Sequence, residues 1–523
     1  MQQSPPDAVP EPAESEQITV RLIIGAVAVT LLLASLGQTI VSPALPVIVG
    51  ELGGLDHLTW VVTAYLLAST VVAPIYGKLG DLYGRKRVLQ AAIFIFLGGA
   101  IVSGLATNML TLIIGRTIQG LGGGGLMVVA MSVVADVIPP RRRGKVQGIF
   151  GAVFGVSTIA GPLLGGFFVE HFSWHWIFFI NLPLGLFALA VIAMALPSQT
   201  LRTSHRIDYL GAVLLTAALS SFVLFTSLGG NTIAWDSAPS IALIAIAVVG
   251  LALFLWVERR ADEPVLPMSL FSNNVFTISN VVGAIVGLAM FGSITFLPLY
   301  LQTVQGVSPT TSALALLPMM MGLIGASMLS GFVMSKTGRY KILPIGATAI
   351  LFVGMVLLTT IGVDTPVWLI GCYMFLVGFG IGPINSVSIT AVQNAIPRSM
   401  VGVGTASVTM FRQIGGSVGV SVFGALFSAG LASHLVGLGD ALEGAHSINA
   451  QTLAALPENT RALALEAFVS ALHPIFYAGA GAAALAFVFT LFLKEVPLAS
   501  TFRKEPEAEI DAEEAATAAA VGD

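Results

Sequence analysis

The stretch "GKLGDLYGRKR", Gly77–Arg87, decides the fold because it returns farther along the chain as "GFVMSKTGRYK", Gly331–Lys341. In both stretches, glycines, an arginine and a final basic residue stand at the same offsets. A long apolar run lies on either side of each stretch. The match predicts a chain made of two halves that are built alike, and a chance match between two short basic loops is the alternative.

The composition predicts that both halves lie in a membrane. Of the 523 residues, 56% are hydrophobic and only 10% are charged, whereas soluble domains are nearer 25% charged. A helix needs about 20 apolar residues to cross the hydrocarbon core of a bilayer. Fourteen runs of about this length lie near residues 22–42, 59–77, 88–107, 109–134, 145–168, 175–196, 209–228, 239–257, 275–300, 310–334, 342–361, 367–391, 402–431 and 473–493.

The distribution of basic residues tests this count independently, because cytoplasmic loops are enriched in Lys and Arg. If the N-terminus is cytoplasmic, every even-numbered gap between runs contains Lys or Arg. The odd-numbered gaps contain a single basic residue, Arg461, in the long loop 432–472. One span more or fewer would destroy this alternation. We therefore predict fourteen transmembrane helices in a bacterial-type inner membrane, with both termini in the cytoplasm.

The separation of the two matching stretches predicts the domain organisation. They lie eight runs apart, which fits two pseudo-symmetric six-helix bundles with two inserted helices between them. The fold class is thus an all-α integral membrane protein. Repeated halves are typical of secondary transporters, whose substrate site lies between the repeats. The predicted segments are a disordered cytoplasmic tail at 1–20, the N-terminal bundle at 21–200, the inserted helices at 201–265, the C-terminal bundle at 266–495 with the outer loop 432–472, and a disordered acidic cytoplasmic tail at 496–523.

Two apolar runs contain an arginine. "GRTIQGLGGGG", Gly115–Gly125, has the glycine spacing of a nucleotide-binding loop, but such a loop follows a strand, whereas this apolar run simply continues. A guanidinium in hydrocarbon costs roughly 3 kcal/mol or more unless it meets water, a partner or backbone carbonyls. We expect Arg116 to line a cavity, with a position among the outer headgroups as the alternative. Arg412, near the middle of its run, is expected to line the cavity of the C-terminal half or to bond a helix carbonyl.

These segments together resemble the major facilitator superfamily, in its fourteen-helix drug:proton antiporter branch. "GKLGDLYGRKR" is similar to the signature loop of the superfamily and "GRTIQGLGGGG" to its helix-4 motif. "GPLLGG", Gly161–Gly166, is similar to the helix-5 antiporter motif, and "FRQIGGSVG", Phe411–Gly419, to helix 13 of the branch. The resemblance implies a multidrug-type secondary exporter of amphipathic small molecules that works by alternating access, with a role for Arg116 in proton transfer.

The candidate site residues fall into three groups. The resemblance implies that Asp81 holds the two halves together when the cytoplasmic side is closed. Each polar residue of the substrate and proton pathway, which is the first group, could instead form a helix–helix hydrogen bond. The substrate and proton pathway is assigned to Gly37, Gln38, Thr39, Arg116, Gln119, Arg412 and Gln413. The conformational switch loop is assigned to Gly77, Asp81, Gly84, Arg85 and Arg87. The kink of the antiporter motif is assigned to Gly161, Pro162, Gly165 and Gly166.

The first run departs from the branch at one position. "LGQTIV", Leu36–Val41, has Gly37 where the branch carries an aspartate, and no other carboxylate lies centrally in a run. Proton-coupled exporters usually carry a membrane-embedded acid. Coupling could use an edge carboxylate such as Glu51, or a histidine near the outer face. Alternatively, coupling is altered and the cavity is electropositive, which favours neutral or anionic amphiphiles over cations.

Other functions are alternatives with less support from the sequence. A lipid transporter is one, because the loop 432–472 is apolar, and a non-transporting sensor is another. An enzyme, a cofactor, a metal site and nucleic-acid binding are not expected, because no nucleophile–base–acid set, metal-ligand cluster or nucleic-acid surface is evident. The expected partners are small amphipathic substrates, the lipid bilayer and, if transport is coupled, protons. The chain is expected to act as a monomer.

Overall fold

The computed structural model describes residues 14–52, 58–196, 208–229, 233–307, 309–435 and 457–499. Helices dominate these ranges, and the β interaction that they contain is an isolated bridge between Gly229 and Ile233. The predicted all-α class is therefore confirmed. The helices are α1 (Glu14–Thr39), α2 (Leu45–Leu52), α3 (Leu58–Tyr83), α4 (Arg85–Gly104), α5 (Met109–Val137), α6 (Pro140–His171), α7 (Trp176–Phe179), α8 (Asn181–Ala195), α9 (Tyr209–Leu228), α10 (Ala238–Glu258), α11 (Asn274–Thr303), α12 (Pro309–Leu314), α13 (Leu317–Thr337), α14 (Ile342–Leu358), α15 (Val367–Ala395), α16 (Val401–Leu435) and α18 (Glu458–Leu491), with short 3-10 turns at Ser42–Ala44, Met268–Ser272 and Arg398–Met400.

The number of spans is close to the predicted number. Within the described residues, 13 helices are long and apolar enough to cross a membrane. The remaining predicted span, 342–361, coincides with α14, which has 17 residues. This length is at the lower limit for a helix that crosses about 30 Å of hydrocarbon. The count of fourteen spans therefore stays a prediction.

Three segment boundaries differ from the predicted ones. α1 begins at Glu14, inside the predicted tail 1–20, whose first 13 residues lie outside the described ranges. α18 begins at Glu458, so the last part of the predicted loop 432–472 is helical, and most of the rest of the loop lies outside the described ranges. Residues 493–499 pack on the protein, because the Leu498 amide donates to the Gly338 carbonyl and the Arg141 amide donates to the Ala499 carbonyl. The predicted acidic tail therefore cannot begin before residue 500.

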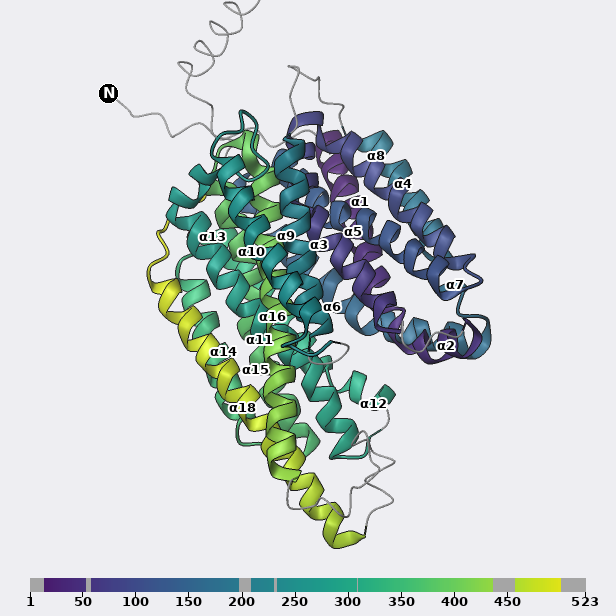
Figure 1. The fold of residues 1–523 in the computed structure, drawn as a ribbon. Coiled ribbons are helices and arrows are strands. Elements are labelled where there is room, and N and C mark those ends of the chain that lie inside the picture. The colour runs from purple at the N-terminus through teal and green to yellow at the C-terminus, as the bar shows by residue number, and fades with distance from the viewer. Residues whose placement is uncertain are drawn as a thin grey trace, which may run out of the picture.

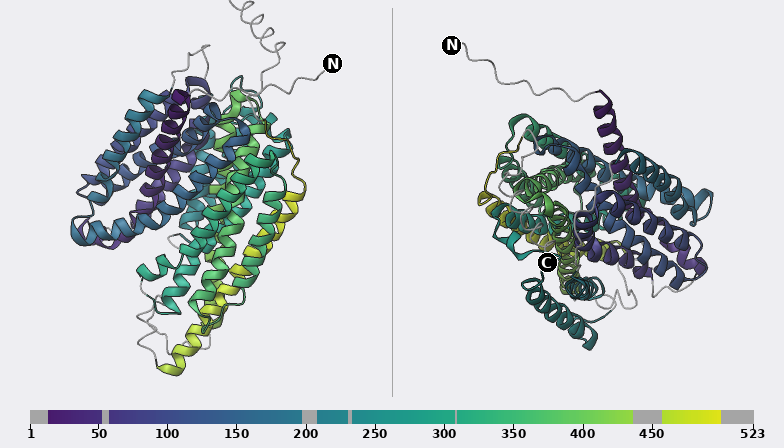
Figure 2. Two further views of the ribbon diagram at one scale, coloured as in Figure 1. Left: turned by 180° about the vertical axis from the view of Figure 1, so that it is seen from behind. Right: turned by 90° about the horizontal axis from the view of Figure 1, so that it is seen from above.

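The helices form two bundles that meet at one end of the molecule. α1–α8 make the purple-to-blue half and α11–α18 the teal-to-yellow half (Figures 1 and 2). The halves lie close together at the face where α1 begins and α18 ends, which we call the terminal face, and they diverge toward α2 and α12 at the opposite face (Figure 1). Each half has its own core of buried apolar side chains, around Phe96 in the first half and around Leu297 and Phe476 in the second.

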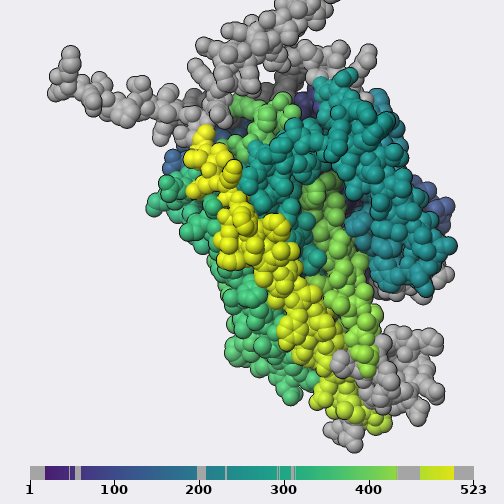
Figure 3. Space-filling model, turned by 60° about the vertical axis from the view of Figure 1, so that its left-hand side comes forward, coloured from purple at the N-terminus to yellow at the C-terminus, as the bar shows by residue number. Residues whose placement is uncertain are grey.

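The inserted helices α9 and α10 lie against the seam between the halves. Leu215, Leu219 and Phe254 of the insert join one buried cluster with Val71 of α3 and Ile389 of α15. Figure 3 shows the insert (teal) beside the light-green α16 on the outside of the molecule. The insert therefore touches both halves.

The glycine-rich stretch of α5 serves close helix packing. The whole stretch lies inside the continuous helix Met109–Val137, so the strand-and-loop context of a nucleotide site is not formed. A side chain at Gly120 would lie 2.5 Å from the Tyr65 carbonyl oxygen of α3, and one at Gly124 would lie 2.3 Å from that of Ser69. Small residues on one helix face let the backbones of α3 and α5 approach each other.

The repeat that the sequence predicts is visible in the backbone. Gly84 precedes α4 with a φ of 85°, and Gly338 ends α13 with a φ of 70°. L-residues avoid this left-handed region at a cost of about 1–2 kcal/mol. The two matching stretches therefore place a glycine with a positive φ at corresponding positions, although ψ differs, 132° at Gly84 and 9° at Gly338.

Candidate functional site

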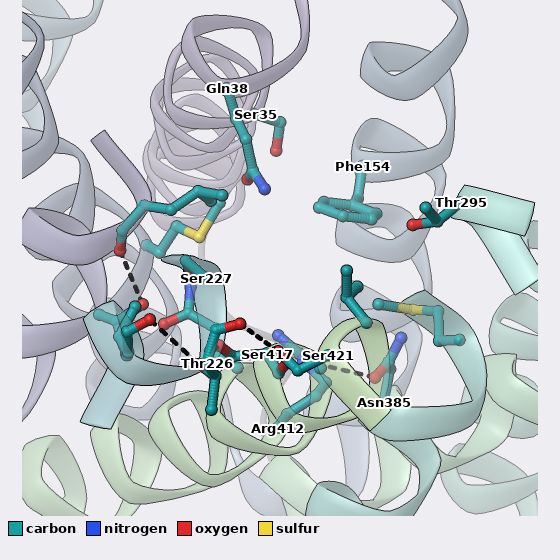
Figure 4. A pocket seen from close by; sticks show the side chains of 18 of the residues that line it. Ser35, Gln38, Phe154, Thr226, Ser227, Thr295, Asn385, Arg412, Ser417 and Ser421 are labelled. Atoms are coloured by element: carbon teal, nitrogen blue, oxygen red, sulfur yellow. Dashed lines mark hydrogen bonds between the residues drawn. The ribbon is translucent and has the colours of Figure 1, made fainter. Parts of the chain in front are cut away.

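A cavity of about 760 Å³ lies between the two halves. Its lining comes from α1, α3, α5 and α6 of the first half, from α11, α13, α15 and α16 of the second, and from the insert. Pockets for small organic ligands span roughly 300–1,000 Å³, so the cavity has the size of a binding site for such molecules. Figure 4 shows side chains of both halves pointing into it.

Arg412 is the charged residue of this lining, and no carboxylate from the described ranges belongs to it. The side chain extends from α16, and its Nη1 donates to Oδ1 of Asn385 on α15 at 2.8 Å (Figure 4). This one neutral acceptor leaves the cationic charge of the guanidinium unopposed. An unopposed guanidinium favours anions and disfavours cations in the same cavity.

Amides, hydroxyls, methionines and aromatic rings complete the lining. Gln38 and Gln413, which were predicted for the pathway, both line the cavity. The Oε1 of Gln413 and the Nε2 of the buried Gln147 have no hydrogen-bond partner within the described residues. Met127 and Phe154 are among the apolar residues of the walls. Polar side chains on otherwise apolar walls can orient an amphipathic molecule.

Arg116 lies elsewhere, and the expectation that it lines the cavity is not met in this conformation. The residue is fully buried inside the first half. Its Nε donates to the Val61 carbonyl at 3.1 Å, and its Nη1 donates to the Gly37 carbonyl at 2.7 Å and to Oε1 of Gln119 at 2.8 Å. Its guanidinium carbon also lies 4.4 Å from the centre of the Tyr65 ring. Arg116 thus ties α1, α3 and α5 together through carbonyls and an aromatic face, which is one way to compensate a buried cation.

Three more predicted pathway residues belong to this packed interior. Gly37 and Gln119 bind Arg116. Thr39 donates to the Ser35 carbonyl at 3.2 Å and to the Ser157 carbonyl at 3.1 Å, so it links α1 to α6. None of the three is in the cavity lining. For Thr39 the structure therefore shows the helix–helix hydrogen bond that the sequence left as the alternative, whereas the bond between Gln119 and Arg116 lies within α5.

The antiporter-motif glycines also pack within the first half. A side chain at Gly161 would lie 2.1 Å from Oγ1 of Thr39, and one at Gly165 would lie 2.2 Å from the Ile40 carbonyl oxygen. Pro162 lies inside α6, and Gly166 has open space beside it. The motif thus brings α6 against the end of α1, next to the buried Arg116 network.

The cavity is closed toward the terminal face by contacts between the halves. Oδ1 of Asp81 accepts from the Gly402 amide at 2.9 Å, and Oδ2 accepts from the Val403 amide at 3.0 Å. Arg85 pairs with Asp81 at 3.2 Å and with Asp136 at 2.5 Å. Asp81 of the first half therefore caps α16 of the second, and the helix dipole favours its negative charge there.

Each of the two matching stretches packs against the other half of the molecule. A side chain at Gly77 would lie 2.7 Å from the Gly402 carbonyl oxygen of the second half. A side chain at Gly331 would lie 2.2 Å from the Gly144 carbonyl oxygen of the first half. Arg141 of α6 donates to the Ser335 carbonyl at 2.9 Å. Both copies of the repeat thus close the terminal face, and we call these contacts the terminal-face clasp.

One residue of the predicted switch loop is not in this clasp. Arg87 points outward from α4 with an exposed side chain, whereas Arg85, two residues earlier, is buried. Basic residues at the end of a membrane helix also serve as topology signals, and Arg87 has the position of one.

Sequence reasoning missed several cavity residues. Asn385 carries the contact with Arg412, and Thr226, Ser227 and Trp235 of the insert also line the cavity. The one available signal was their polarity inside or beside apolar runs, as in "GPINSVS" from Gly382 to Ser388. Because the sequence does not say which helices adjoin, that signal could not be assigned to a site.

Comparisons with known proteins agree with this architecture. The model of the Major Facilitator Superfamily matches residues 27–420. An MFS-type transporter of Mycobacterium tuberculosis (strain ATCC 25618 / H37Rv) is 41% identical, over 91% of this chain and 70% of that protein. The multidrug transporter protein MdtP of Bacillus subtilis is 36% identical, over 97% of this chain and 98% of that protein.

Solved structures share the fold at low identity. The human organic anion transporter MFSD10 superposes with a TM-score of 0.61 at 14% identity, over 90% of this chain and 99% of that chain. The proton:xylose symporter XylE gives a TM-score of 0.59 at 16% identity, over 92% and 97%. The family match, the relatives and the two-bundle architecture agree, and the chain belongs to the major facilitator superfamily.

Proposed function

We propose that this chain is a secondary active exporter of amphipathic small molecules, of the multidrug type. The cavity between the halves carries the proposal, because it is large enough for such molecules and takes its walls from both bundles. Two relatives from Bacillus subtilis support the class by their names, the multidrug transporter protein MdtP and multidrug resistance protein 3, the second at 35% identity over 78% of this chain.

The chemistry of the lining favours substrates with an apolar body and an anionic or hydrogen-bond-accepting group. Arg412 presents a positive charge that no lining carboxylate of the described residues balances. Met127, Met131 and Phe154 offer apolar surface nearby. Flexible methionine side chains adapt to ligands of different shape, which suits an exporter of many compounds.

Alternating access is the proposed mechanism. We assign the terminal face to the cytoplasm, because the basic residues Arg85, Arg141 and Arg143 lie there and basic loops stay inside. The structure then represents a state that is closed toward the cytoplasm. Rocking of the halves would break the terminal-face clasp and open the cavity inward. A single chain supplies both halves, so a monomer suffices.

Protons are the proposed coupling ion, with the titrating group outside the cavity lining. Gly37 leaves the apolar run of α1 without an acid, and the edge carboxylate Glu51 accepts a hydrogen bond from the Trp174 indole at 2.7 Å. In everted vesicles, we expect collapse of the pH gradient to abolish uptake. Gly37→Asp places an acid near Arg116 and should change the dependence on the gradient, whereas the uncharged Gly37→Asn should not. Uptake that survives collapse of the gradient would refute proton coupling while leaving export intact.

Charge selectivity tests the substrate class. Everted vesicles would receive an anionic dye or a dicationic dye of similar size, with the wild-type chain, Arg412→Lys or Arg412→Gln. We expect the wild type to prefer the anionic dye, the lysine variant to keep part of the preference, and the glutamine variant to lose it. Preference of the wild type for the dication would contradict the proposed selectivity, and absence of any uptake would contradict the exporter.

A further inference from the structure

The insert contributes directly to the cavity, although it stands outside both six-helix halves. Val223, Thr226 and Ser227 of α9 line the cavity, and so do Gly229 and Trp235 of the connection to α10. A pair of helices that only linked the two halves would not need to reach the space between them.

Hydroxyl contacts hold the end of α9 against the second half. The Oγ atoms of Thr226 and Ser417 lie 2.6 Å apart. Ser421 donates to the Thr226 carbonyl at 2.5 Å. Figure 4 shows Thr226, Ser417 and Ser421 together with Arg412 on one side of the cavity. The contacts therefore fix the position of the insert relative to the charged group of the site.

Trp235 presents an aromatic surface beside this cluster. Its ring lies across Gly229, where a side chain would come within 2.3 Å of the ring atom Cζ3. It also meets Phe225 edge to face, with ring centres 5.1 Å apart. The residue is 39% exposed, so part of the indole is available to a ligand while Gly229 and Phe225 hold the rest. A ring held in this way is a rigid platform for a flat apolar group.

We infer that the insert is a third wall of the substrate site, on which Trp235 binds the aromatic body of a substrate whose anionic group faces Arg412. The inference rests on the proposed function and deepens it, because it names the part of the chain that selects aromatic over aliphatic substrates. Trp235 is thus a specificity-determining residue that lies outside both repeats.

Two sulfonates of equal charge separate the aromatic contribution from the charge. Proteoliposomes with the full chain would transport pyrenesulfonate or decanesulfonate. We expect Trp235→Ala to raise KM for pyrenesulfonate roughly three- to tenfold, the range for loss of one aromatic contact. KM for decanesulfonate should stay within about twofold and kcat should change little for either. Trp235→Phe should retain part of the preference.

Trp256 provides the matched control. It lies on α10 of the same insert, outside the cavity lining, with its ring 4.1 Å from the Arg260 guanidinium carbon. Trp256→Ala should leave both KM values unchanged. As an independent measurement, pyrenesulfonate should quench indole fluorescence of the wild type and of Trp256→Phe, and the quenching should fall sharply in Trp235→Phe.

The outcomes distinguish this inference from the proposed function. Wild-type transport of the sulfonates with an unchanged pyrenesulfonate KM in Trp235→Ala would overturn the inference alone. Equal effects on both sulfonates would also overturn it, since they would indicate a structural role for the ring. Absence of transport of either sulfonate by the wild type would overturn the proposed selectivity and, with it, this inference.

Discussion

Two arginines inside membrane helices have different roles in this structure. Arg116 makes three hydrogen bonds within the first half and contacts the Tyr65 ring. Among the described residues, Arg412 hydrogen-bonds to Asn385, and it lines the cavity. The first arginine therefore belongs to the packing of one half, and the second belongs to the site between the halves.

This difference predicts that alanine in place of Arg116 lowers stability, whereas alanine in place of Arg412 lowers transport. Arg116→Ala should destabilise the first half by about 1–3 kcal/mol for each buried acceptor that is left without its donor. Arg412→Ala should change stability little but impair transport of anionic substrates. Thermal unfolding of the two purified variants in detergent, compared with transport in vesicles, checks both expectations. An Arg116→Ala variant as stable as the wild type would contradict the structural role.

The sequence could not separate these two residues. Both stand in long apolar runs and both are followed by glutamine, Gln119 three residues after Arg116 and Gln413 directly after Arg412. The distinction depends on which neighbouring helices face each side chain. In a helix that is apolar all round, hydrophobic periodicity does not reveal which face meets the cavity.

At the scale of elements, the terminal-face clasp joins α3 of the first half to α16 of the second. Asp81 binds two amides at the start of α16 and the buried Arg85. Charge-assisted hydrogen bonds of this kind contribute about 1.5–3 kcal/mol each. The clasp therefore stabilises the state in which the terminal face is closed.

Loss of the Asp81 charge should weaken the clasp. Asp81→Asn can accept through only one side-chain oxygen and loses its ion pair with Arg85, so the population should shift toward opening at the terminal face. The check is maleimide labelling of Thr405→Cys, a buried residue near the clasp, in a Cys372→Ser background. Labelling should increase in Asp81→Asn and stay unchanged in Arg87→Gln, whose arginine is exposed. Equal labelling in all three proteins would exclude a role of Asp81 in closure.

Element boundaries were largely predictable, but the neighbours of each element were not. Apolar length and charge placed the helices, and the repeat paired Gly84 with Gly338, which both have a positive φ. The sequence did not predict the break between α12 and α13, because the run 310–334 stays apolar through it. The sequence also did not predict the contact of the insert with Ser417, because the sequence of an apolar helix does not indicate which helix it packs against.

At the scale of the whole molecule, the two halves and the insert form one transport unit. The sequence predicted the pseudo-symmetric bundles, the inserted pair and a polar site between the halves. It could not predict which face is closed, because in the proposed alternating-access mechanism one sequence adopts both states, whose free energies differ by only a few kcal/mol. The clasp at the terminal face and the divergence of the halves toward the opposite face define the state seen here (Figure 1).

The most direct test of the account is a pair of distances measured by double electron–electron resonance during turnover. In a Cys372→Ser background, spin labels at Leu110→Cys and Trp368→Cys would report on the opposite face, and labels at Arg87→Cys and Ile342→Cys on the terminal face; all four side chains are exposed. When substrate and a pH gradient are applied, the first distance should shorten as the second lengthens. If both distances stayed constant while the labelled protein transported its substrate, the halves would not rock about the cavity and the account would be wrong.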